Sequence, residues 1–143
     1  MQNVVAKLAD NSIGTWKLNV PKSKVTPPST NPVTDLTLVY EAIDGGVKIT
    51  VTGQRKDGAA FNFGAPSKYD GKEYPITGAP WDTFSATQID ANTCTFEDKK
   101  TGGKFHVLGR QVISEDGKTM TITSEGTDAD GKPTSATQVY EKQ

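Results

Sequence analysis

Apolar and polar residues alternate along most of this chain. Residues 47–52, Val-Lys-Ile-Thr-Val-Thr, place aliphatic side chains on one face of an extended segment and Lys or Thr on the other. Residues 120–123 and 136–140 repeat the pattern with weaker contrast. A period of two is that of a β-strand, whereas a helix would repeat about every 3.6 residues. The pattern therefore predicts an all-β chain.

Turn signals divide these segments at intervals of about a dozen residues, the spacing of short strands joined by tight loops. Asp-Gly suits such hairpins because Gly readily adopts positive φ and Asp tolerates it; the pair recurs at 44–45, 57–58, 70–71, 116–117 and 130–131. We predict about ten strands. They span residues 14–20, 34–43, 46–54, 59–64, 67–70, 72–77, 81–89, 92–99, 103–114 and 118–126, with a last one near 133–142. The segments 67–70 and 72–77 are also compatible with one bent strand.

Two segments depart from the strand pattern. Residues 2–10 are predicted to form a short helix, and residues 21–32 an extended loop, because prolines at 21, 27, 28 and 32 remove backbone donors and fix φ. Sequential antiparallel strands must protect their edges, and a closed up-and-down barrel of about 8–10 strands does so while leaving room inside for side chains or one small ligand. A two-sheet sandwich is the alternative. The absence of long crossover connections favours the barrel.

Composition limits the classes of function. The 143 residues are expected to form a single domain, 1–143, and the net charge of -1 gives no reason to expect nucleic acid, which favours a basic face, as a partner. One His and one Cys exclude a zinc cluster and an internal disulfide, and we expect neither a metal nor another cofactor. No apolar run approaches the roughly 18 residues of a membrane span.

The compartment is left open. The start, Met1 followed by Gln-Asn-Val-Val-Ala-Lys, has neither the basic region nor the long apolar stretch of a signal peptide. The chain is therefore either a secreted or periplasmic domain whose signal has been removed, or a cytoplasmic protein.

The two ends of the chain carry a family resemblance. Gly14-Thr15-Trp16-Lys17-Leu18 and the closing Ala136-Thr137-Gln138-Val139-Tyr140-Glu141-Lys142 resemble the ends of fatty-acid-binding proteins. The Gly-x-Trp start is shared more widely by lipocalins. The resemblance implies a calycin barrel with an internal ligand cavity, in which Gly14 and Trp16 are structural.

Two departures from fatty-acid-binding proteins change what the resemblance implies. The proline-rich loop stands where that family has a helical lid, so we expect no helical lid, a mouth that is open or covered by a loop, and a closer similarity to lipocalin-like bacterial barrels. The family's last strand points an Arg and a Tyr inward to hold a carboxylate. Here the Tyr is Tyr140, but the Arg position is Gln138, which lacks the forked charge that pairs with a carboxylate.

Arg110 resembles a second inward Arg of fatty-acid-binding proteins, and in lipocalins a late Arg packs over the Trp of Gly-x-Trp instead. Arg110 is therefore interpreted either as a ligand contact or as a partner of Trp16. If Arg110 points inward, alternation places His106 on the same face, where it would be a polar ligand contact or a general base.

The remaining candidates are aromatic and acidic. Phe61 and Phe63 share a strand face, and Trp81 follows Gly-Ala-Pro; all three are candidate ligand contacts, with ordinary core packing as the alternative. Cys94 alternates with Phe96 and is predicted to be a small buried thiol. Glu97-Asp98, followed by two lysines, is interpreted as a solvated strand end.

The function we expect is non-catalytic binding of a small, largely apolar molecule inside the barrel, as a carrier or sequestration protein. Its polar contacts would come from Arg110, Gln138, Tyr140 and His106. The alternative is an isomerase, cyclase or lyase that uses His106 or Tyr140 for proton transfer. A third possibility is a barrel filled by its own side chains. The oligomeric state, monomer or dimer, is left open.

Overall fold

The computed structural model describes residues 4–143 and consists mainly of antiparallel strands. The helical elements are α1 (Val4–Ser12) and a short 3-10 turn, η1 (Val20–Lys22). The strands are β1 (Gly14–Leu18), β2 (Lys24–Thr26), β3 (Val33–Ile43), β4 (Gly46–Arg55), β5 (Ala60–Ser67), β6 (Tyr74–Pro75), β7 (Thr83–Asp90), β8 (Thr93–Lys99), β9 (His106–Ile113), β10 (Thr119–Thr127) and β11 (Pro133–Lys142).

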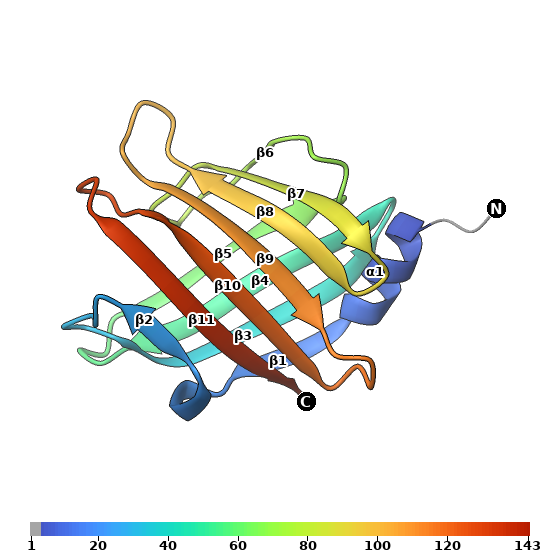
Figure 1. The fold of residues 1–143 in the computed structure, drawn as a ribbon, viewed down its shortest axis with the longest axis horizontal. Helices are drawn as coiled ribbons and strands as arrows, with labels where there is room; N and C mark the ends of the chain where they lie inside the picture. The colour runs from blue at the N-terminus through green and yellow to red at the C-terminus, as the bar shows by residue number, and fades with distance from the viewer. Residues whose placement is uncertain (1–3) are drawn as a thin grey trace.

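The strands form one sheet that curves into a nearly closed barrel (Figure 1). Their order is β5-β4-β3-β1-β11-β10-β9-β8-β7-β6, and a single bridge between Gly64 and Thr77 joins the two edges. The first strand pairs with the last, so the two edges of the sheet are β5 and β6, and their approach at this bridge protects them as barrel closure does. The predicted all-β barrel with a short N-terminal helix and no helical lid is confirmed for the residues that the structure describes.

Two of the predicted elements differ from the structure. Residues 67–70 are not a separate strand, because β5 continues to Ser67 and the chain then turns at Tyr69, whose φ is 56°. The proline-rich segment is not wholly a loop. It contains η1, whose N-cap Asn19 accepts a hydrogen bond from the Lys22 N–H, and β2, which pairs with β11 through Val25 and Ala136.

The strand register defines the inner face of the barrel. Residues directly opposite each other on paired strands share a face, so Leu38 and Lys142, both opposite Trp16, lie on its side of the sheet. Continuing this pairing around the barrel gives an inner face that includes Leu36, Tyr40, Val51, Phe61, Phe63, Phe84, Phe96, Asp98, Gly109, Gln111, Ile122, Ser124, Gln138 and Tyr140.

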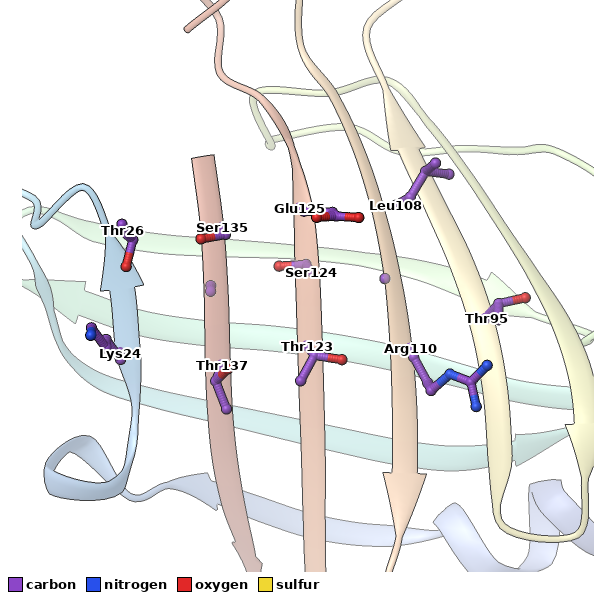
Figure 2. Close-up of a pocket in the computed structure, with 12 residues that line it drawn as sticks. Lys24, Thr26, Thr95, Leu108, Arg110, Thr123, Ser124, Glu125, Ser135 and Thr137 are labelled. Atoms are coloured by element: carbon purple, nitrogen blue, oxygen red, sulfur yellow. The ribbon is translucent and has the colours of Figure 1, made fainter. Parts of the chain in front are cut away.

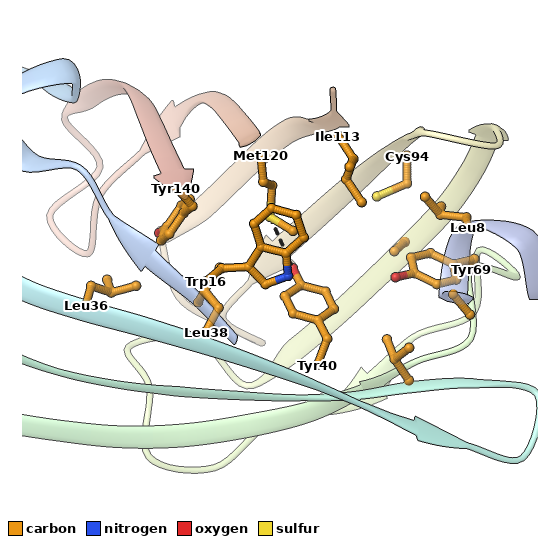
Figure 3. Close-up of a cluster of buried hydrophobic side chains, with 13 residues drawn as sticks. Leu8, Trp16, Leu36, Leu38, Tyr40, Tyr69, Cys94, Ile113, Met120 and Tyr140 are labelled. Atoms are coloured by element: carbon orange, nitrogen blue, oxygen red, sulfur yellow. Dashed lines mark hydrogen bonds between the residues drawn. The ribbon is translucent and has the colours of Figure 1, made fainter. Parts of the chain in front are cut away.

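The end of the barrel covered by α1, called here the helix end, holds the tightly packed core (Figure 3). Trp16 is fully buried there, and its indole N–H donates a hydrogen bond to the Ser12 carbonyl at 2.9 Å. The Lys142 Nζ lies 5.5 Å from the Trp16 ring centroid. Gly14 has a φ of 139°, and an added Cβ would overlap the Lys142 side chain, so the predicted structural roles of Gly14 and Trp16 agree with this packing.

Burial decreases toward the opposite end, called here the far end. Inward-facing residues there, among them Phe61, Phe63, Phe84 and Phe96, are only half-buried, whereas Val47, Ile113 and Met120 at the helix end are almost completely buried. Solvent therefore reaches part of the inward-facing aromatic surface at the far end. The described part of the chain contains no helix that is long and apolar enough to cross a membrane.

Candidate ligand site on the inner barrel wall

A continuous run of aromatic rings crosses the far end of the inner wall. Phe61 and Phe63 on β5 stack with ring centroids 6.2 Å apart, and Trp81 meets Phe63 edge-on at 5.3 Å. Trp81 then stacks on Phe105, just before β9, at 5.1 Å. The Arg55 guanidinium carbon lies 5.7 Å from the Phe61 ring centroid. The run thus extends from β5, on one edge of the sheet, to residues that precede β7 and β9 on the other side of the closure. Its aromatic surface is half-buried.

A second pair of rings lies on β7 and β8. Phe84 and Phe96 face inward with their ring centroids 6.4 Å apart. The Phe96 ring covers Gly109 on β9 so closely that any Cβ at that position would overlap the ring. A glycine is therefore required for the ring to lie flat against the wall, as glycine in a strand often signals a close approach of this kind.

Polar groups on the inner wall are concentrated on β9 and β11. Gln111 is 5% exposed, and its Oε1 accepts a hydrogen bond of 2.7 Å from the Tyr40 hydroxyl, but its Nε2 has no partner among the described residues. Ile122 separates Gln111 from Gln138 in the same row. The Tyr140 hydroxyl donates to the Gln138 Oε1 at 3.3 Å.

Trp81 contributes a second unpaired donor. Its indole N–H is buried and has no acceptor in the described part of the chain. Buried polar atoms are normally hydrogen-bonded, so Trp81 and Gln111 together place two unsatisfied donors where an acceptor on a bound molecule would satisfy them. Trp81 was predicted from sequence as a candidate ligand contact, whereas Gln111 was not.

Asp98 is the one acidic side chain on this part of the wall, within the residues described. It stands on β8 opposite Phe84 and Val107, and is half-buried. Burial, with a smaller contribution from the Glu97 carboxylate, raises the pKa of Asp98 to about 7. The interpretation of Asp98 as part of a solvated strand end was wrong, because alternation along β8 turns Glu97 outward and Asp98 inward.

Arg110 and His106 do not face the barrel interior. Both are exposed on the outer face of β9, because the register places Gln111 and Gly109 inward instead. Arg110 is therefore not the partner of Trp16, a position that Lys142 occupies. His106 instead pairs with the Glu97 carboxylate on the outside of the sheet. The expectation that these two residues line the interior was wrong.

The acid/base alternative loses its main support from this placement. His106 is outside, and Tyr140 is almost completely buried, which raises the pKa of its hydroxyl far above the ordinary value. A phenol that holds its proton so firmly is a poor general base near neutral pH. No cluster of three potential metal ligands occurs within residues 4–143.

A groove lies on the outer face of the same strands (Figure 2). Its volume is about 490 Å³, and hydroxyl-bearing side chains dominate its lining, with Lys24 and Arg110 as the cations and Glu125 as the anion. The small residues Gly109, Ser124 and Ala136, which belong to the inner row, form its floor. The groove is open and polar, so it is a weaker candidate for an apolar ligand than the inner wall.

The sequence-predicted candidates divide between the two faces. The structure brings Phe61, Phe63 and Trp81 together at the far end and places Gln138 and Tyr140 on the opposite inner wall, but it separates Arg110 and His106 from them. Sequence reasoning missed the unpaired amide of Gln111, the inward Asp98, and three rings at positions 84, 96 and 105. The alternation around Phe96 was a usable signal for Asp98, which lies two residues further along the same strand.

Comparison with known proteins supports the fold alone. No family model matches the chain, and no curated protein matches it. Among solved structures, the chain is similar to a redesigned β-barrel, mFAP1, bound to DFHBI, with 14% identity, a TM-score of 0.54, and 95% of this chain and 99% of that chain covered. It is also similar to the S-type phycobiliprotein lyase CPES from Guillardia theta, with 10% identity, a TM-score of 0.63, and 99% and 94% of the two chains covered.

Proposed function

We propose that this protein binds a small, largely apolar molecule inside its barrel, against the inner wall of the far end, and acts as a carrier or sequestration protein. The observation that carries the proposal is the combination of half-buried aromatic surface with two buried donors that lack partners, on Trp81 and Gln111. Ligand sites typically combine an apolar lining with a few polar groups that set orientation.

The positions of the polar groups support a defined orientation for the ligand. Gln111 is opposite Cys94 on β8, four residues deeper along the strand pair than Val107 and Asp98. Four strand residues span about 13 Å. An elongated molecule would therefore reach from the far end to the Gln111 amide with its apolar length against Phe96 and Ile122.

One of the similar barrels supports the proposal by analogy. The redesigned β-barrel is described with a small molecule, DFHBI, bound to it. A barrel of this class can therefore hold a ligand of that size, and the inner wall of this chain carries the aromatic surface such a ligand needs.

Two adjacent residues on β10 allow the inner wall to be tested against the outer groove. Ser124 faces inward and Thr123 faces outward, at the same height on the same strand. A neutral apolar dye, 1,6-diphenylhexatriene, would be titrated into the protein while its fluorescence is followed. We expect Ser124→Phe to weaken binding by at least about tenfold by filling the interior, and Thr123→Phe to change it less than about twofold.

A second matched pair of variants, on β11, repeats the comparison at another place on the wall, so that a folding defect in one variant does not decide the result. Ala136→Phe adds a ring to the inner face of β11, and Thr137→Phe adds one to the outer face. Circular dichroism would confirm that each variant retains its β-sheet. Loss of binding only in the outward variants would place the ligand in the outer groove and overturn the proposal, as would the absence of any dye binding by the unchanged protein.

A further inference from the structure

Asp98 is an acid without a counter-charge on an otherwise apolar part of the inner wall. Its neighbours across the strands are Phe84 on β7 and Val107 on β9, and the next inward residue on its own strand is Phe96. No Lys, Arg or His pairs with it in the described part of the chain, where the ion pairs involve Glu73, Asp82, Glu97 and Glu141.

The location is an unfavourable one for a carboxyl group unless something compensates it. Burying an unpaired charge is costly, and carboxyl groups in apolar surroundings usually have a basic partner or several hydrogen-bond donors. Asp98 accepts no hydrogen bond within residues 4–143, and the charge that acts on it is that of the like-charged Glu97 on the outer face. Protonation relieves this cost in the free protein, and a cation that arrives with a ligand would relieve it in the complex.

The rings beside Asp98 favour one kind of cation. Phe84 is directly opposite Asp98, Phe96 is two residues away on the same face, and their ring centroids are 6.4 Å apart. Aromatic faces attract organic ammonium groups through their quadrupoles, most strongly when the site is partly desolvated. A carboxylate flanked by two rings is therefore suited to an alkyl- or aryl-substituted ammonium rather than to a hydrated metal ion.

We infer that the interior ligand carries an organic ammonium group, which lies between Asp98, Phe84 and Phe96 while its apolar part extends toward Gln111. This inference rests on the proposed function, because it concerns the same inner wall. It adds the charge and the orientation of the ligand.

Three dyes with one apolar body test the inference. These are 1,6-diphenylhexatriene, its trimethylammonium derivative and its propionate derivative, which are neutral, cationic and anionic. At about pH 8, where Asp98 is mostly ionised, we expect the cationic dye to bind about fivefold or more tighter than the neutral dye. The anionic dye is expected to bind weakest.

Asp98→Asn is the decisive variant, because it keeps the shape of the side chain and removes the charge. We expect it to lose the preference for the cationic dye, with the affinities for the neutral and cationic dyes within about twofold of each other. Glu97→Gln is the matched control, since it removes a neighbouring carboxylate from the outer face of the same strand. It is expected to retain the preference.

The outcomes separate the two proposals. If no dye binds, the proposed function fails and this inference fails with it. If the neutral dye binds but the cationic dye has no advantage, or if the advantage survives in Asp98→Asn, the inference is overturned and interior binding stands. A circular dichroism spectrum of Asp98→Asn that matches that of the unchanged protein shows that a lost preference is not a folding defect.

Discussion

The two tryptophans of this barrel lie at opposite ends and differ both in burial and in the hydrogen bonding of the indole N–H. Trp16, at the helix end, is fully buried and donates its indole N–H to the Ser12 carbonyl. Trp81, at the far end, is half-buried and stacks on Phe105, and its buried indole N–H has no acceptor among the described residues. The two indole N–H groups therefore differ: the one at the helix end is satisfied within the protein, whereas the one at the far end retains unused hydrogen-bonding capacity.

Burial, though not hydrogen bonding, differs between the two tyrosine–glutamine pairs. The Tyr40 hydroxyl donates to Gln111, which is almost completely buried, whereas the Tyr140 hydroxyl donates to Gln138, which is half-buried. The inner wall thus grades from a packed core to a surface that solvent reaches. If this gradient of burial also governs stability, substitutions at the helix end should lower the free energy of unfolding more than matched substitutions toward the far end.

The largest expected effect comes from truncating the two tryptophans. Trp16→Ala should lower the free energy of unfolding by about 4 kcal/mol, because it opens a large cavity and removes the bond to Ser12. Trp81→Ala should lower it by only about 1 kcal/mol, since the ring is already half-exposed. Urea unfolding followed by circular dichroism measures both. Equal losses would contradict the distinction between the ends.

Removing the two buried hydroxyls should give a smaller contrast in the same direction. Tyr40→Phe leaves the Gln111 Oε1 without its donor in a dry environment, so we expect a loss of about 2 kcal/mol. Tyr140→Phe should cost about 0.5 kcal/mol, because water can replace the lost bond at the half-buried Gln138. Equal losses in the same unfolding assay would show that the interior is equally dry at both positions, and the reverse order would contradict the gradient of burial.

Asp98→Asn should act in the opposite direction and only at higher pH. The folded protein keeps the Asp98 proton up to a pKa of about 7, whereas the unfolded chain loses it near pH 4. Between these values the folded state binds more protons, so the stability of the unchanged protein falls as pH rises. The variant lacks this loss and should become about 1.5 kcal/mol more stable than the unchanged protein by about pH 8, after allowing for solvent at the half-buried carboxyl.

The measurement is a series of urea unfolding curves from about pH 4 to pH 8 for the two proteins. Near pH 4 their stabilities should agree. The elements packed against Asp98 present Phe84 and Val107, and the charge that acts on it comes from Glu97. Glu97→Gln is therefore the control, and a pH-independent difference between Asp98→Asn and the unchanged protein would contradict the burial of this carboxyl.

A small effect is expected at Gly109. An added Cβ would overlap the Phe96 ring, and overpacking of a dense core costs about 1–3 kcal/mol. The Phe96 ring borders the half-buried far end and can move away from the wall, so Gly109→Ala should cost about 1 kcal/mol. In a Phe96→Ala background the cost should disappear. A persistent cost would show that the strand backbone, not the ring, is strained.

Sequence reasoning recovered the barrel because its local signals agree with one another. The glycines of the Asp-Gly turns, at 45, 58, 71, 117 and 131, all have positive φ, as tight turns require. The inward side of β5 was also correct, since Phe61 and Phe63 alternate with Asn62, a clear contrast between apolar and polar residues. Where contrast is strong, alternation specifies the buried face.

The face of β9 could not be predicted in the same way. His106, Leu108, Arg110 and Val112 lie outside, and Val107, Gly109, Gln111 and Ile113 lie inside, so each face mixes apolar and polar residues. A shift of one residue exchanges the two sets with little change in hydrophobicity. The register is fixed by the neighbouring strands, through pairs such as Met120 with Ile113, and that information is absent from the strand's own sequence.

The rate at which a reagent labels the single buried cysteine would measure how often the barrel opens locally. Cys94 is 2% exposed, directly opposite Gln111 and two residues from Phe96 on β8, and burial raises the pKa of its thiol to about 12. A thiol reagent can attack it only when β8 separates from its neighbours, because the reactive thiolate is scarce and shielded in the closed barrel. Since the sequence has no other cysteine, the labelling rate under native conditions counts these openings directly. A ligand that holds the strands together would slow that rate in proportion to its occupancy.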